Sequence, residues 1–290
     1  MLKAFQQLWQ WYGGTFSSKV VNVFRWSIAL VTALSALTWL PYLKLYFTSA
    51  GFIDRETVRV ISSGYSIFYF YDTPWFVYLM YALLLVALFF ILWNKFTRVA
   101  FVVVFVLFES FLNRMALVQY GGTAIVEIAL FFALFIDFNA AKKGKEVPAW
   151  PLRLLQIQIC LVYLSAALEK VKIPTWTNGT QLQGIAVGSL SYLPLAHFLS
   201  NPILSVMLTY LTMAGELSFT FLVWNPATRR PILLLVAFVH LCIACVMNVT
   251  YFSFIMLAVL TIFLRDEDLE EFMRWCQVAR KKLKPFLLKS

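Results

Sequence analysis

The sequence predicts an all-α, polytopic membrane protein with about eight transmembrane helices. Three observations support this prediction. The 290-residue chain is 61% hydrophobic and 13% charged, with a mean hydropathy of +0.78, whereas soluble domains are about half apolar and a quarter charged. Apolar segments of near-bilayer length follow one another along most of the chain. The basic residues fall mainly in alternate loops between these segments, as the positive-inside rule requires.

The predicted spans are separated by polar segments, some no longer than a tight turn. The seventh and eighth spans are separated only by Asn248, Val249 and Thr250, so they form either two helices or one broken helix. The eight predicted spans are residues 24–43, 75–93, 99–118, 123–138, 153–171, 203–223, 231–247 and 251–264.

Two amphipathic segments flank the predicted transmembrane domain, which covers residues 21–264. Residues 1–20 carry Phe5, Leu8, Trp9 and Tyr12 and no signal-peptide pattern, which favours a short interfacial helix. Residues 265–290 begin with an acidic turn and end in a basic run. That order is typical of a surface helix, so we expect a basic amphipathic cytoplasmic tail, either resting on anionic headgroups or solvated without a specific partner.

The formal charge of +10 predicts membrane orientation rather than nucleic-acid binding. Most of the 24 Lys and Arg residues lie in the termini and in the loops that share a side with them. Both termini are therefore predicted to be cytoplasmic, and Lys170 to face outward. We expect an integral protein of the bacterial cell membrane, with the lipid bilayer as its main partner and no nucleic acid.

Lys170 is a candidate base at the end of the fifth span. A helix entering at Arg153 has risen roughly 26 Å by Lys170, about one hydrocarbon thickness, and Pro174 then ends it. Gln156, Tyr163 and Lys170 recur every seven residues and share a face, which we expect to face other helices. If Glu169 or Glu127 pairs with Lys170, the lysine stays charged and is a snorkelling anchor instead.

Charged residues inside the other spans need partners, because a charge in the bilayer centre is costly. Arg114 and Glu127 flank the Gly121-Gly122 turn at similar depth, so we predict a salt bridge between them, which either fixes helix register or anchors a substrate. Asn113 lies four residues after Glu109 and extends this polar interior.

Two further polar stripes are predicted to meet. Thr209, Thr212, Glu216 and Thr220 share one face of the sixth span, and His240, Ala244 and Asn248 share one face of the seventh. His240 is either a core residue hydrogen-bonded to Glu216 or part of a site. Together these residues indicate a polar pocket in the outer half of the bundle, closed by the segment around Trp176 and Tyr192. The sequence contains no HExxH motif and predicts no metal site.

Several ordered segments resemble the HTTM (horizontally transferred transmembrane domain) family, which includes the membrane domain of vitamin K-dependent gamma-glutamyl carboxylase. The resemblance extends from about Phe24 to Leu264. Ala167 stands where the family usually has Gly. The segments are FRWSIAL, YFTSAGFIDR, WNKFTRVA, LNRM, LVYLSAALEKVKIPTWTNG, AGELSF and VHLCIACVMNVTYFSFIM.

The resemblance implies a carboxylase-like bundle in which Lys170 is the base that deprotonates a reduced quinone of the vitamin K or menaquinone type. It also gives His240 a catalytic role. The histidine that the carboxylase has near Asn113 is absent here. We expect the remaining site residues to bind substrate: Asn113, Arg114, Glu127, Tyr163, Trp176, Glu216, Asn248 and Tyr251.

The function expected from this resemblance is base chemistry on a membrane quinol, in a vitamin K-dependent carboxylase or epoxidase-like enzyme. The alternative is a processing or immunity protein for a small secreted peptide, similar to the HTTM protein that acts in producing a sporulation-delaying peptide toxin. A small-solute transporter is a weaker alternative, because the sequence has no internal repeat.

Overall fold

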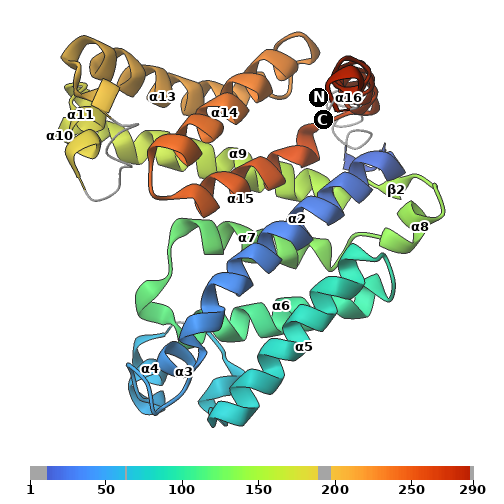
Figure 1. The fold of residues 1–290 in the computed structure, drawn as a ribbon, viewed down its shortest axis with the longest axis vertical. Helices are drawn as coiled ribbons and strands as arrows, with labels where there is room; N and C mark the ends of the chain where they lie inside the picture. The colour runs from blue at the N-terminus through green and yellow to red at the C-terminus, as the bar shows by residue number, and fades with distance from the viewer. Residues whose placement is uncertain (1–11, 63, 189–196, 288–290) are drawn as a thin grey trace, which may run out of the picture.

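The computed structural model describes residues 12–62, 64–188 and 197–287, and its N-terminal half consists of helices joined by short turns (Figure 1). Ser or Asp side chains cap three of these helices and Pro starts another, so the chain defines these helix ends without long loops. In order they are α2 (Ser18–Trp39), α3 (Leu43–Phe47), α4 (Arg55–Ile61), α5 (Pro74–Leu92), α6 (Thr97–Arg114), α7 (Gly121–Ala133) and α8 (Phe138–Lys142).

The C-terminal half is also helical. Single 3₁₀ turns occur in both halves, at Leu40–Tyr42, Ile67–Tyr69, Ala116–Val118, His197–Ser200 and Thr261–Phe263. The helices are α9 (Trp150–Val171), α10 (Pro174–Thr177), α11 (Gln181–Val187), α13 (Pro202–Leu222), α14 (Pro226–Val246), α15 (Thr250–Leu260) and α16 (Asp266–Leu287).

Five of these helical segments are long and apolar enough to cross a membrane, which confirms an all-α membrane bundle but not the predicted count of eight spans. They are Ser18–Phe47, Pro74–Leu92, Trp150–Val171, Pro202–Leu222 and Pro226–Val246. Helix α6 has the length of a span but carries Arg98, Glu109 and Arg114. Helix α7 and the segment Thr250–Phe263 are apolar but shorter.

Helices α2, α7 and α15 join the two halves of the bundle. Helix α2 packs against α5 on one side and α15 on the other, and α7 contacts α6, α9 and α15. Figure 1 shows α5 and α6 on one side of this centre and α9, α13 and α14 on the other. Helices α14 and α15 are separate and pack along each other, so the chain here forms two helices rather than one broken helix.

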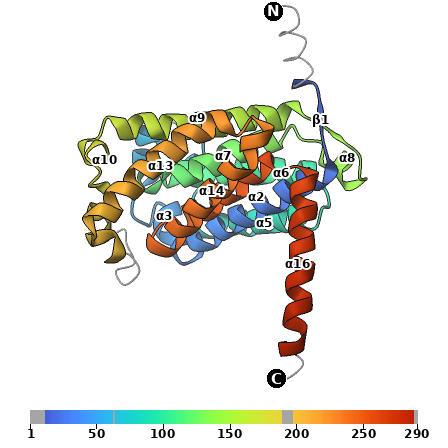
Figure 2. The same cartoon turned by 90° about the horizontal axis from the view of Figure 1, so that it is seen from above.

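One end of the bundle collects the basic loops. Figure 2 places α8 and α16 at that end and α3 and α10 at the other, with α16 running across the bundle helices rather than along them. Arg229 and Arg230 of α14 pair with the acidic first turn of α16, as in the bond from Arg229 Nη1 to Asp268 Oδ2 at 2.6 Å. These contacts hold α16 across the end of the bundle, which is the orientation that a helix lying in the membrane interface would adopt.

The predicted interfacial helix at residues 1–20 lies largely in residues 1–11, outside the described residues. In the part that is described, Thr15–Phe16 forms strand β1, antiparallel to β2 (Val147–Pro148). Helix α2 then begins at Ser18, because the Ser17 hydroxyl accepts a hydrogen bond from the Val20 N–H and so caps it.

Candidate functional site

Lys170 lies in the last turn of α9 and forms an ion pair with Glu216 of the adjacent helix α13. Its Nζ is 2.8 Å from both Glu216 Oε1 and Oε2, and each side chain is 19% exposed. Helices α9 and α13 pack closely along their length, so the pair bridges two neighbouring helices at the end where α10 begins. A carboxylate that binds one ammonium with both oxygens is a strong, charge-assisted contact.

The partner of Lys170 differs from both acidic residues that the sequence suggested. Glu169, the preceding residue, pairs instead with Lys172 at 2.5 Å, and both of those side chains are exposed. The other contact of Lys170 is aromatic, because its Nζ lies 5.0 Å from the centre of the Trp176 ring. Trp176 therefore covers the ammonium from the loop side, within the range of a cation–π interaction.

His240 of α14 is hydrogen-bonded to Tyr163 of α9, with 2.9 Å between Nε2 and the tyrosine hydroxyl. His240 is only 5% exposed, and its Nδ1 has no hydrogen-bond partner among the described residues. The Tyr163 ring packs on Phe219, 4.4 Å between ring centres. The direct hydrogen bond considered between His240 and Glu216 is not formed, because the histidine bonds to Tyr163 and the carboxylate to Lys170.

A small cavity of about 90 Å³ brings these groups together between α9, α13, α14 and α15. Tyr163, Glu216 and His240 line it, so the stripes predicted on the sixth and seventh spans meet in part, at Glu216 and His240, whereas Ala244 and Asn248 are not in the described lining. Gly215 also lines it, and a Cβ there would meet nothing within 4 Å. The other lining residues are Val162, Ala166, Leu211, Thr212, Leu235, Val236, Val239, Ile243, Phe252 and Met256.

The face formed by Gln156, Tyr163 and Lys170 points at other helices along its whole length, as predicted. Gln156 Nε2 donates to the Ile262 carbonyl at 2.7 Å, beyond the end of α15. Tyr163 meets α14, and Lys170 meets α13. Each polar group on this stripe thus has a partner inside the bundle, which satisfies it away from lipid.

The predicted salt bridge between Arg114 and Glu127 is wrong. Arg114, which is 1% exposed, places Nη2 3.4 Å from Asp72 Oδ2 and 2.8 Å from the Ile53 carbonyl oxygen. The sequence prediction compared the depth of charged residues on adjacent helices. It missed the counterion of Arg114, because Asp72 lies in the loop before α5 rather than on a helix. The signal available in the sequence was an acidic residue directly before Thr73-Pro74, a helix start at the same end of the bundle.

Asn113 joins α6 to the loop between α4 and α5 through hydrogen bonds. Its Oδ1 accepts from the Ser62 hydroxyl at 3.0 Å, and its Nδ2 donates to the Tyr65 carbonyl and to Glu109 Oε1. Glu127 of α7 lies near Glu109 of α6.

The remaining predicted substrate-binding residues stand apart from the cavity. Asn248 lies between α14 and α15, Tyr251 lies in the first turn of α15, and neither belongs to the described lining. Tyr192 lies outside the described residues. Tyr251 is 45% exposed and close to Tyr120. The structure therefore gathers Tyr163, Glu216 and His240 around one cavity, with Lys170 and Trp176 next to them, and places Asn113, Arg114 and Glu127 elsewhere.

Together, the helices and these contacts define a membrane bundle with a small cavity between four of its helices, whose mainly apolar wall carries a few polar groups. The chain belongs to the HTTM family, whose domain matches residues 66–267. It is similar to the sporulation-delaying protein SdpB of Bacillus subtilis (strain 168), with 28% identity over 144 residues, or 48% of this chain and 45% of that protein. The match thus spans less than half of that relative's length. No solved structure matches.

Proposed function

We propose that this HTTM protein carries out proton-transfer chemistry on a reduced quinone drawn from the membrane, with Lys170 as the base. One observation carries the proposal: Glu216 lies on the wall of a membrane-embedded cavity and holds the Lys170 ammonium through both carboxylate oxygens. The ion pair is neutral as a whole, and a proton that passes from Lys170 to Glu216 within it leaves a neutral amine without creating a net charge in the bundle.

The residues present suit a quinol in chemistry. The cavity walls are mainly apolar, which suits a ring, and polar groups stand on them at Glu216 and at the Tyr163–His240 pair. When bound, a quinol would supply an acidic hydroxyl and two electrons. The cavity of about 90 Å³ has room for a few water molecules rather than a ring. For a ring to bind, α13 and α14 must therefore move apart. Most residues of these two helices are not buried inside the bundle, so few contacts oppose that movement.

The protein's own groups have separate roles in this proposal. Lys170 Nζ accepts a proton once its own has passed to Glu216, 2.8 Å away. His240 has no partner for Nδ1 among the described residues, while the Tyr163 hydroxyl holds the ring through Nε2. Trp176 covers the pair and limits the access of water, which favours transfer within the bundle over exchange with solvent.

Maturation of, or immunity to, a small secreted peptide is the second candidate. The similarity to a protein named for sporulation delay supports it. For either function we propose a bacterial cell-membrane location with both termini cytoplasmic. The supporting observation is that α8 and α16, which carry basic residues, lie at the same end of the bundle (Figure 2).

Consumption of a reduced naphthoquinone by the purified protein in air-saturated buffer, with dioxygen as the two-electron acceptor and no peptide present, tests the first proposal. Gly215→Leu should abolish it by filling the cavity, because a side chain at Gly215 has open space to enter. Gly184→Leu is the matched control, since Gly184 is also open but is exposed on α11. Leucine is the better helix former at both positions. If the parent protein consumes no quinol, the proposal fails and peptide maturation becomes the leading candidate.

A further inference from the structure

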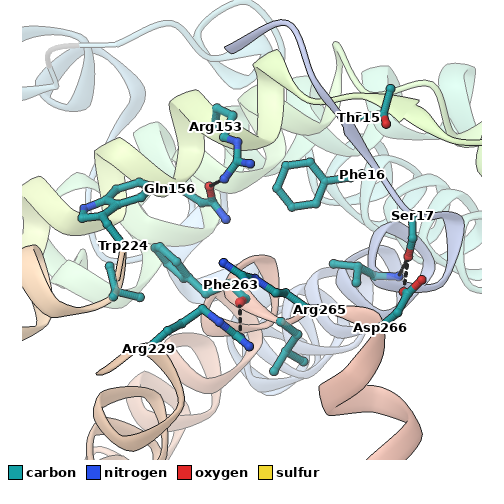
Figure 3. Close-up of a pocket in the computed structure, with 13 residues that line it drawn as sticks. Thr15, Phe16, Ser17, Arg153, Gln156, Trp224, Arg229, Phe263, Arg265 and Asp266 are labelled. Atoms are coloured by element: carbon teal, nitrogen blue, oxygen red, sulfur yellow. Dashed lines mark hydrogen bonds between the residues drawn. The ribbon is translucent and has the colours of Figure 1, made fainter. Parts of the chain in front are cut away.

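A second cavity, of about 420 Å³, lies at the opposite end of α9 from Lys170. It is enclosed by the starts of α2, α9 and α14, the end of α13, and the segment that leads into α16. Figure 3 shows that arginines from separate elements converge on it, with Arg153 coming from α9 and Arg265 from the segment before α16. No step at the Lys170 site uses these residues.

The described lining contains three guanidinium groups and one carboxylate. The carboxylate belongs to Asp266, which accepts a hydrogen bond from the Ser17 hydroxyl. Arg153 donates to Gln156 Oε1 at 3.0 Å and lies over the Phe16 ring at 4.9 Å. Arg153 and Arg265 are close enough for their charges to repel each other. The pocket thus holds like charges together, which an anion between them would relieve.

Arg229 adds an unsatisfied donor to the same pocket. It is 4% exposed, and its two Nη atoms are occupied by Asp268 and by the Phe263 carbonyl. Its Nε has no hydrogen-bond partner among the described residues. A buried guanidinium N–H without an acceptor costs free energy, so a bound oxygen ligand would repay part of that cost.

We propose that this pocket binds the phosphate group of an anionic ligand, supplied by a membrane phospholipid headgroup or by free phosphate. Guanidinium groups match phosphate oxygens in geometry as well as in charge. The position favours the lipid source: α16 lies across this end of the bundle (Figure 2), as it would at headgroup depth. Trp224 and Val223 give the pocket an apolar wall against which glycerol or acyl carbons can pack.

Thermal unfolding of the purified full chain tests this proposal with three probes: short-chain phosphatidylglycerol, short-chain phosphatidylcholine and inorganic phosphate. The parent should be stabilised by phosphatidylglycerol and not by phosphatidylcholine. Arg265→Gln should weaken that binding about fivefold, the usual effect of one basic residue at an anionic surface, and Arg265→Lys should restore most of it. Arg274→Gln is the matched control, because it removes the same charge from an exposed position on α16.

Each outcome is decisive. Stabilisation by phosphatidylglycerol that depends on Arg265 supports the site and assigns it to lipid. Stabilisation by inorganic phosphate with the same dependence supports phosphate recognition and assigns the free anion. Equal losses in Arg265→Gln and Arg274→Gln, or no stabilisation by either anion, would overturn the site, since the attraction would then be general surface charge or absent.

Discussion

At the scale of single residues, the site depends on two pairs, because Tyr163 bonds to His240 and Glu216 bonds to Lys170. Tyr163 satisfies one ring nitrogen of His240, and Glu216 satisfies Lys170. Neither pair includes a charge that faces lipid alone, so the site can be held inside the bundle without a large stability cost. Each pair has one member on α9, which makes α9 the helix that organises the site.

Tyr163→Phe should lower the free energy of unfolding by about 1–3 kcal/mol, because it leaves both ring nitrogens of buried His240 without a partner. The Phe ring keeps the packing on Phe219. Tyr210→Phe is a suitable control, since the Tyr210 hydroxyl donates to the Thr177 carbonyl at an exposed position. Unfolding in mixed micelles measures both. Equal stability of the two variants would show that the Tyr163–His240 bond contributes nothing.

At the scale of elements, buried ion pairs attach the loops to the bundle. Arg114 ties α6 to the loop before α5, and Arg229 ties α14 to α16. Both arginines are nearly fully buried. Removing one partner of a buried pair strands the other charge away from water. Loss of either buried pair should therefore destabilise the protein more than loss of an exposed surface pair.

Arg114→Met and Asp72→Asn should each destabilise the protein by about 3–5 kcal/mol, and the double variant should recover part of the loss. The pair Arg55–Glu56, which is exposed, serves as the control and should give no more than about 1 kcal/mol of coupling. A double-mutant cycle measures the two coupling energies. Simple additivity at Arg114 and Asp72 would mean that the two side chains do not interact.

The first turn of α16 should detach in acid. Burial alone would raise the pKa of Asp268, but hydrogen bonds and charge from Arg229 outweigh burial and hold this pKa below its usual value of 3.8. The stabilisation is therefore complete above that usual value and is lost as the pH falls through the lower folded-state pKa. Asp268→Asn should imitate the acid state at neutral pH.

Hydrogen exchange over α16 measures this detachment, after correction for the pH dependence of intrinsic exchange. Asp268→Asn should lose protection in the first turn at pH 7. Glu267→Gln provides the control, because Glu267 is 73% exposed and lies 3.7 Å from Arg230. Unchanged protection in Asp268→Asn would show that α16 is held by other contacts.

At the scale of the whole molecule, the distribution of charge predicts the topology. Single cysteines at Lys143 and Thr180, in a background where the four native cysteines are replaced, should react with an impermeant reagent from opposite faces of the membrane. Lys143 should react from the cytoplasmic face. Reaction of both positions from one face would overturn the orientation and the outward-facing site that depends on it.

Much of this arrangement could be predicted from the sequence. The predictions that were wrong concern contacts between different elements of the chain. Periodicity on one helix correctly identified the face that carries Tyr163 and Lys170, because spacing within a helix is fixed. Partners on different helices were less predictable, since depth is only one of the coordinates that decide a contact. Depth brought Glu216 and His240 to one cavity, but it paired Arg114 with the wrong carboxylate because loop residues such as Asp72 were left out.

Lys170→Arg tests the central claim most directly. Arginine keeps the charge that pairs with Glu216 but cannot give up its proton at workable pH, so it preserves an anchor and removes a base. Lys172→Arg is the matched control, because Lys172 is exposed and pairs with Glu169. In the quinol assay, Lys170→Arg should lower turnover by about two or more orders of magnitude while Lys172→Arg keeps the parent rate. Full turnover by Lys170→Arg would contradict the assignment of Lys170 as the base.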